Sequence, residues 1–336
     1  RGRERARGDG AARAMDSIVE TFADKTPIEQ DDGPAPVVRI AYNKSFTLVM
    51  NYFRRVLVDE EYSKRALLLS AEAIDHNAAN YTAWQYRRKC VGEMCKGLPR
   101  EEQLAAWREE LEYCTEQCLD NMKNYQVWFH RRACISALGE ATDELEFIAS
   151  VLEEDAKNYH AWGHRQWVLK AFSLWDGELA YVDSLLQEDV RNNSAWNQRY
   201  YVLKHTRDLS STDLVASEIA YALTQIARAP NNASPWTYLK GLVEPLGFTA
   251  FPQIRQACER LGAGGALADA AGTTAEGAPP TRCVPALGLL VDVLVAGGSA
   301  DDKLRAAALC GELATLDAIR ERYWRWRQSR VDAAAA

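Results

Sequence analysis

The sequence predicts an all-α protein built as a solenoid of helical hairpins, and two observations support this fold class. A tryptophan motif recurs along the chain, with Trp84, Trp128, Trp162, Trp196 and Trp236 spaced by 44, 34, 34 and 40 residues. Such spacings are typical of helical repeats that stack on their neighbours. Between the tryptophans, apolar residues recur with the period of an α-helix. We expect about 14 helices and no sheet.

Charge, cysteine content and the lengths of apolar segments exclude several classes of protein. The net charge is -7, with 40 Lys and Arg against 47 Asp and Glu, so no overall positive field attracts nucleic acid. The eight cysteines form no Cys-x-x-Cys pair, and no signal peptide precedes them, which indicates reduced thiols. The most apolar stretch, 284–296, contains Pro285, Gly288 and Asp292 and is shorter than a membrane span. We expect a soluble, cytoplasmic protein.

The elements are expected in the following order. Residues 1–21 are predicted to be disordered or foreign to the natural chain, and 22–43 to form an extended, proline-rich arm. Five helical hairpins are expected over 44–248. Divergent helical hairpins are expected over 249–330, with a flexible Ala- and Gly-rich loop at 262–280.

Two hairpins illustrate the expected boundaries. In the fourth, a first helix is predicted over 176–186 with Asp176 as its N-cap, and a second helix restarts at Ser194 after two asparagines. In the fifth, Ser234 is the predicted N-cap and Pro235 the first helical residue, where the missing N–H of proline costs nothing.

The repeated residues are expected to be structural. A bulky tryptophan near the start of every second helix fills the groove between repeats. The arginine three residues later lies on the same face and is expected to bind a carboxylate or the carbonyls of the preceding turn; the four are Arg87, Arg131, Arg165 and Arg199. His160 and His164 have the spacing of metal ligands, but no third ligand is near. The residues show no self-contained active site.

Two turns carry side chains that are free of packing. Lys123-Asn124-Tyr125-Gln126 and Lys157-Asn158-Tyr159-His160 each join the two helices of a hairpin, one repeat apart. Aligned, they form a polar, cationic ridge at one edge of the stack. Two interpretations stay open at this point, a binding ridge and a pair of capped turns with solvated lysines.

Several motifs resemble the α subunits of the CaaX prenyltransferases, farnesyltransferase and geranylgeranyltransferase type I. The resemblance extends over about residues 22–248 and returns near the C-terminus, and it departs from the family at 262–280. The motifs are Pro27–Val38, Asn51–Arg54, Lys123–Trp128, Glu144–Ile148, Asp155–Trp162, Leu174–Asp176, Glu188–Asn193, Tyr238–Gly241 and Tyr323–Arg325.

This resemblance implies a right-handed, crescent-shaped superhelix around a β subunit in an obligate heterodimer. The dimer would transfer a farnesyl or geranylgeranyl group from a prenyl diphosphate to the cysteine of a C-terminal CaaX motif. Zn²⁺ would be bound by the β subunit and Mg²⁺ would accompany the diphosphate, with no metal ligand in this chain. No nucleic acid and no membrane insertion are implied.

The resemblance also implies site residues. Lys157 matches the lysine that reaches the diphosphate and is the expected catalytic residue, and Lys123 is expected to matter much less. Asn158, Tyr159 and His160 would lie at the subunit boundary beside it, and Tyr125 and Gln126 near the CaaX peptide.

Two alternatives remain. The first is the α subunit of Rab geranylgeranyltransferase, which is disfavoured because no leucine-rich repeat or β-sandwich insertion is visible. The second is a non-catalytic helical scaffold that binds peptides in its concave face. Co-purification separates the scaffold from a prenyltransferase subunit, since a scaffold would be a soluble monomer and the prenyltransferase an obligate heterodimer.

Overall fold

The computed structural model describes residues 16–267 and 282–335, and within them every regular element is helical. This confirms the predicted all-α class. The helices of the first half are α2 (Lys44–Val58), α3 (Lys64–His76), α4 (Tyr81–Met94), α5 (Arg100–Asp120), α6 (Tyr125–Leu138), α7 (Glu144–Glu154) and α8 (Tyr159–Phe172). Those of the second half are α9 (Glu178–Glu188), α10 (Asn193–Thr206), α11 (Thr212–Arg228), α12 (Ala233–Val243), α13 (Pro252–Gly262), α14 (Val284–Gly297), α15 (Ala300–Leu316) and α16 (Glu321–Ala335), with short 3-10 turns at Glu244–Leu246, Phe248–Ala250 and Ala318–Arg320.

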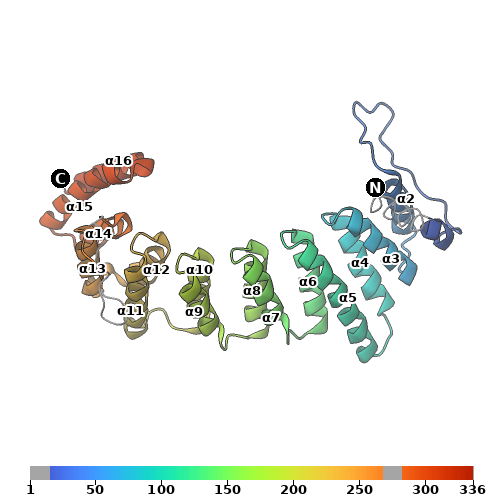
Figure 1. Cartoon of the computed structure of the whole chain (residues 1–336), viewed down its shortest axis with the longest axis horizontal. Coiled ribbons are helices and arrows are strands. Elements are labelled where there is room, and N and C mark those ends of the chain that lie inside the picture. The colour runs from blue at the N-terminus through green and yellow to red at the C-terminus, as the bar shows by residue number, and fades with distance from the viewer. Residues whose placement is uncertain (1–15, 268–281, 336) are drawn as a thin grey trace, which may run out of the picture. The chain divides into compact units, whose positions relative to one another are not determined.

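The chain divides into two compact units, residues 1–173 and 174–336. Successive helices pack in antiparallel pairs, α3 with α4, α5 with α6 and α7 with α8 in the first unit, and α9 with α10 and α11 with α12 in the second. Within the first unit the second helices α4, α6 and α8 lie side by side, and within the second α10 lies beside α12 (Figure 1). Each repeat is therefore a helical hairpin, as the sequence predicts.

An asparagine is the N-cap of the second helix in each of the five motif hairpins. Asn80, Asn124, Asn158, Asn192 and Asn232 each accept a hydrogen bond through the side-chain oxygen from a backbone N–H of the first helical turn. This satisfies donors that a helix end leaves without partners. The recurring asparagine of the motif is thus a capping residue.

Two of the predicted helix starts were wrong. The N-cap of α12 is Asn232 and not Ser234, so Pro235 is the third helical residue; it still lies within the first turn, where no backbone N–H is needed. The residue before α9 is Gly177 and not Asp176, and its φ of 81° is a left-handed conformation that favours glycine.

The N-terminal prediction was also wrong in part. Residues 16–21 are helical, and Phe22 directly after them is only 2% exposed. Its ring lies 5.6 Å from the Tyr52 ring, and the guanidinium carbon of Arg65 lies 4.8 Å from its centre. This buried anchor orders the segment, because the phenylalanine would lose its packing if the segment detached. Residues 1–15 lie outside the described part of the chain.

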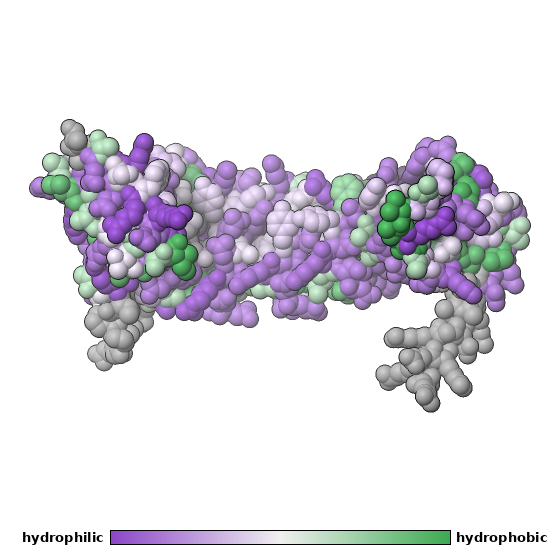
Figure 2. Space-filling view, turned by 90° about the horizontal axis from the view of Figure 1, so that it is seen from above, coloured by the Kyte–Doolittle hydropathy of each residue, from purple (hydrophilic) through white to green (hydrophobic). Residues whose placement is uncertain are grey.

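The C-terminal hairpins pack through apolar side chains. In α14 the buried side chains include Leu287, Leu290, Val291 and Leu294, and they pack in a core shared with α13, α15 and α16. No described helix combines the length and the apolar character that a membrane span requires. Figure 2 shows that strongly apolar residues on the visible face are interspersed with polar ones. Most of the predicted 262–280 loop falls outside the described residues.

Candidate functional site

The tryptophans fix the turn inside each hairpin. In all five motifs the indole N–H donates to the backbone carbonyl six residues earlier, over 2.8 to 3.0 Å. The pairs are Trp84 with Ala78, Trp128 with Met122, Trp162 with Ala156, Trp196 with Val190, and Trp236 with Pro230. All five rings are buried. The prediction that they pack between helices is confirmed.

The arginines hold neighbouring repeats together through buried glutamates. Arg131 on α6 donates from Nε and Nη2 to the two carboxylate oxygens of Glu144 on α7, over 2.6 and 2.7 Å. His164 on α8 bonds the same carboxylate at 2.7 Å. Arg87 and His130 bind Glu110 in the same way, at 2.6 and 2.8 Å for the guanidinium and 2.5 Å for the ring. One carboxylate therefore joins three consecutive helices.

Burial and charge set the protonation of these clusters. Burial opposes ionisation of Glu144, but the hydrogen bonds from His164 and Arg131 outweigh it, so the pKa of this carboxyl is below its ordinary value. Burial lowers the pKa of His164, which favours the neutral ring. Each cluster thus holds an ionised carboxylate, a guanidinium and a neutral imidazole.

The second unit varies this arrangement. Arg199 binds Glu218 at 2.8 and 2.9 Å, and the Tyr238 hydroxyl donates to the same glutamate at 2.6 Å. Glu178 accepts from Gln198 at 2.8 Å. In the first unit Arg165 bonds the carbonyl of Leu145 at 2.9 Å. The prediction that the motif arginines bind carboxylates or carbonyls is confirmed, so these guanidiniums support the stack.

The two Lys-Asn-Tyr turns bring the predicted site residues together. The Tyr125 ring lies 4.2 Å from the His160 ring and 6.5 Å from the Tyr159 ring, edge to face. Tyr125 is 67% exposed and Tyr159 is 74% exposed, so these aromatic side chains face solvent. Desolvation lowers the pKa of His160, and a hydrogen bond to the backbone of Lys123 partly offsets this effect. Gln126 follows Tyr125 in the first turn of α6 and is half-buried.

Asn158 has a different place from its neighbours. Its side chain is buried; the oxygen caps α8 and the amide donates to the Met122 carbonyl of the preceding repeat at 3.1 Å. That carbonyl also accepts from Trp128. Asn158 therefore positions Tyr159 and His160 and does not present its own side chain at the surface.

Both turn lysines are exposed, and Asp155 lies between them. Its Oδ1 accepts the backbone N–H of Lys157 at 3.2 Å, and its Oδ2 lies 3.2 Å from the ammonium of Lys123. The Lys123 side chain is 78% exposed, so this ion pair is weak and leaves the ammonium available. Among the described residues no carboxylate pairs with the Lys157 ammonium.

No three His, Cys, Asp or Glu side chains of the described residues are grouped to hold a metal ion. His164, which has metal-ligand spacing from His160, uses Nε2 to bond Glu144. The eight cysteines are all buried and unpaired.

Sequence reasoning missed a surface that every repeat presents. In the second helix of each hairpin, one face points away from the buried side. It carries the residue three positions before the motif tryptophan and the residues one and four positions after it. We call this surface the exposed stripe. In the first unit it comprises Tyr81, Gln85 and Arg88 on α4, Tyr125, Phe129 and Arg132 on α6, and Tyr159, Gly163 and Gln166 on α8. The signal was available, because these positions have the same period as the tryptophans.

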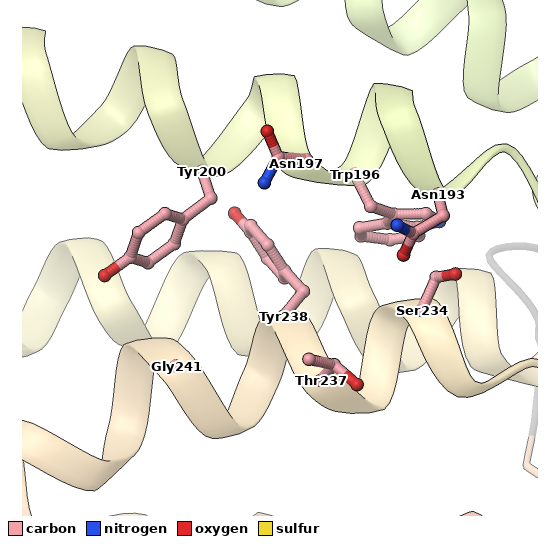
Figure 3. A pocket seen from close by; sticks show the side chains of 8 residues that line it. All are labelled: Asn193, Trp196, Asn197, Tyr200, Ser234, Thr237, Tyr238 and Gly241. Atoms are coloured by element: carbon pink, nitrogen blue, oxygen red, sulfur yellow. The ribbon is translucent and has the colours of Figure 1, made fainter. Parts of the chain in front are cut away.

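In the second unit the stripe residues of α10, together with Thr237 of α12, line part of a pocket between these two helices. The lining residues are Asn193, Trp196, Asn197, Tyr200, Ser234, Thr237, Tyr238 and Gly241. The Asn193 amide lies near the Ser234 hydroxyl at one end, and the Tyr200 ring lies at the other (Figure 3). No lining side chain is charged, so the pocket offers hydrogen bonds and aromatic surface but no counter-ion for a diphosphate.

Comparisons with known proteins agree with this repeat structure. The sequence profile described as "Protein prenyltransferase alpha subunit repeat" matches residues 63–94, 107–138, 141–172 and 175–206. "Protein farnesyltransferase/geranylgeranyltransferase type-1 subunit alpha" of Pisum sativum is 58% identical over 67 residues, 20% of this chain and 20% of that protein. The protein of the same name in Solanum lycopersicum is 43% identical over 102 residues, 30% of this chain and 27% of that protein. The sequence matches thus span a fifth to about a quarter of these curated relatives.

The similarity to a solved structure is more extensive. A chain of "Candida albicans protein geranylgeranyltransferase-I complexed with GGPP" matches with a TM-score of 0.76 and 25% identity, over 92% of this chain and 98% of that chain. Four matched repeats, relatives that share one name and a structural match over nearly the whole chain agree: this chain carries protein prenyltransferase alpha subunit repeats and is similar to protein prenyltransferase alpha subunits.

Proposed function

We propose that this chain is the α subunit of a heterodimeric CaaX prenyltransferase, which moves a farnesyl or geranylgeranyl group from a prenyl diphosphate to a C-terminal CaaX cysteine. The observation that carries the proposal is the match to a geranylgeranyltransferase-I chain over 98% of its length. The relatives named for both enzymes support one α chain that serves two β partners. The cluster of exposed Lys123, Tyr125 and Tyr159 with half-buried His160 gives the chain a surface that can line such a site.

The proposal divides the work between two chains. Because the described residues offer no cluster of three metal ligands, the β partner would supply those for Zn²⁺, and Mg²⁺ would accompany the diphosphate. Zinc, when bound, lowers the pKa of the substrate thiol so that a thiolate is present at neutral pH.

The role of this chain would be electrostatic. As the cysteine sulfur bonds to C1 of the prenyl group, the C1–O bond breaks and its electron pair leaves with the diphosphate. An ammonium at the turn edge would stabilise the negative charge that grows on the leaving oxygen. The aromatic rings of Tyr125, Tyr159 and His160 would exclude water beside it and strengthen this interaction.

Lys157 and Lys123 are the two lysines available for this role. The resemblance assigns it to Lys157, whose ammonium has no carboxylate partner among the described residues. Lys123 lies on the turn whose backbone bonds His160, and is thus next to the aromatic cluster. Loss of one such contact typically lowers the rate by about 10²-fold.

The test is single-turnover prenylation of a CaaX peptide by the heterodimer assembled from this chain and a farnesyltransferase β chain, with Lys157→Ala and Lys123→Ala compared. We expect Lys157→Ala to slow the chemical step about 10²-fold with little change in prenyl diphosphate binding, and Lys123→Ala to have a much smaller effect. The opposite ranking would assign the role to Lys123. Unchanged rates in both intact dimers would show that this chain only scaffolds its partner.

A peptide-binding scaffold is the alternative that the uncharged pocket between α10 and α12 favours. It predicts a monodisperse monomer that binds no prenyltransferase β chain. Co-expression with and without farnesyltransferase β and geranylgeranyltransferase type I β distinguishes the two, since the proposed function requires pairing and C15 or C20 transfer according to the partner.

A further inference from the structure

Two arginines on the exposed stripe differ from the motif arginines beside them. Arg87 and Arg131 are buried and bind carboxylates through two nitrogens each. Arg88 and Arg132 follow them directly on α4 and α6; Arg132 is exposed and Arg88 is half-buried. Within the described residues neither Arg88 nor Arg132 forms an ion pair with a carboxylate. In a chain of net charge -7, two adjacent repeats thus present cations without a counter-ion.

Each guanidinium is held in place by an aromatic ring of the next second helix. The guanidinium carbon of Arg88 lies 4.9 Å from the centre of the Phe129 ring, and that of Arg132 lies 4.7 Å from the Trp167 ring. A guanidinium over a ring keeps its N–H edge free to bind a carboxylate through two hydrogen bonds. The same arrangement in two consecutive repeats indicates a built feature.

Arg88 is fixed further by the buried cluster below it. The Nε2 of His130 bonds Glu110, which leaves Nδ1 as an acceptor, and Nη1 of Arg88 lies 3.4 Å from that nitrogen. Desolvation by burial lowers the pKa of Arg88, while the negative charge of Glu110 acts in the opposite direction. This cation has lost part of its hydration without gaining a carboxylate, a cost that an incoming anion would remove.

We propose that Arg88 and Arg132 bind carboxylate side chains of the partner subunit, so that the first unit's exposed stripe is a docking surface for an acidic segment of that subunit. The inference rests on the proposed function, which supplies the partner. Phe129 favours a protein partner over a small anion, because its side chain is 57% exposed and a diphosphate would leave it uncovered. Parallel neighbouring helices lie about 8–10 Å apart, so one segment reaches both arginines.

The experiment measures association of this chain with a farnesyltransferase β chain, for wild type, Arg88→Gln, Arg132→Gln and the double variant. We expect each single change to raise Kd at least about 10-fold and the double change to make Kd less dependent on NaCl concentration. The matched control is Arg322→Gln on α16, an exposed arginine outside the stripe, which should leave Kd within about 2-fold. Circular dichroism verifies that each variant remains helical.

The outcomes separate this inference from the proposed function. If wild type pairs but both arginine variants keep its Kd, the docking surface is refuted and the proposed function stands. If the variants pair normally but bind prenyl diphosphate more weakly, the arginines bind the substrate and the inference is overturned. If wild type pairs with no β chain, the proposed function fails and the inference falls with it.

Discussion

Replacing Glu144 by alanine should destabilise the first unit strongly. The substitution removes both carboxylate bonds of Arg131 and leaves its buried guanidinium with Thr115 Oγ1 at 2.8 Å and the Phe147 ring at 3.5 Å. It also takes the acceptor from His164. Breaking a buried ion pair by removing one partner costs about 3–5 kcal/mol, which is about 10³-fold in the folding equilibrium constant.

Urea unfolding followed by circular dichroism and tryptophan fluorescence measures this cost. The matched control is Glu140→Ala, whose pair with Arg108 is 2.9 Å long and joins side chains that are about half exposed. That change should cost less than about 1 kcal/mol. The double variant Arg131→Ala/Glu144→Ala tests the coupling between the two side chains, because removing both charges leaves no unpaired buried ion. Its loss of unfolding free energy should be at least about 1 kcal/mol smaller than the sum of the two single losses.

Two results would contradict this reasoning. A Glu144→Ala protein within about 1 kcal/mol of wild type would mean that water reaches Arg131 and that the cluster is not dry. Strictly additive single and double variants would mean that the two side chains act independently, in spite of their two short hydrogen bonds.

Three further predictions follow from the same contacts. Burial lowers the pKa of His130 and His164 below the ordinary value of about 6.5, so below that pH the unfolded chain binds more protons than the folded one. The free energy of unfolding should therefore decrease as the pH falls from about 6.5. Urea titrations at several pH values measure this, and a constant value between about pH 7 and 5 would refute it. Trp196→Phe keeps an aromatic ring but removes one of the two donors to the Val190 carbonyl, which retains the Asn232 amide at 2.8 Å. It should lower the free energy of unfolding by about 0.5–1.5 kcal/mol in urea unfolding, whereas no loss would show that the Asn232 bond alone satisfies the carbonyl. All eight thiols are buried, and desolvation raises the pKa of Cys90 to about 11, so a thiol reagent should label the native protein far more slowly than the unfolded one, and fast native labelling would contradict the burial.

The sequence was sufficient to predict those parts of the fold that recur in every repeat. The asparagine, tryptophan and arginine of the motif predicted a helical hairpin. In the structure the asparagine caps the second helix, the tryptophan donates a hydrogen bond to the turn before it, and the arginine binds a glutamate or a backbone carbonyl of a neighbouring helix. Helix starts were less predictable, because Asn232 and Ser234 are both good caps and local propensity alone does not choose between them.

The partners of the motif arginines could not be assigned from sequence. Glu144 lies 13 residues after Arg131 and Glu110 lies 23 after Arg87, so no fixed spacing marks them, and only the packing of three helices selects them among many acidic residues. The roles of Lys157, Tyr159 and Gln126 remain predictions, since they concern molecules outside this chain.

The tryptophan hydrogen bond has a consequence for how such a chain tolerates insertions. It fixes the carbonyl acceptor six residues before each of the five motif tryptophans, so the turn has the same length in all five motifs. The longer spacings arise elsewhere: α5 has 21 residues where α7 has 11, which accounts for a tryptophan interval of 44 instead of 34, and α11 has 17, which accounts for 40. Extra residues in these repeats are therefore placed as added turns of the first helix. A single residue inserted between Ala156 and Asn158 would instead move the acceptor carbonyl to seven residues before Trp162 and break this hydrogen bond.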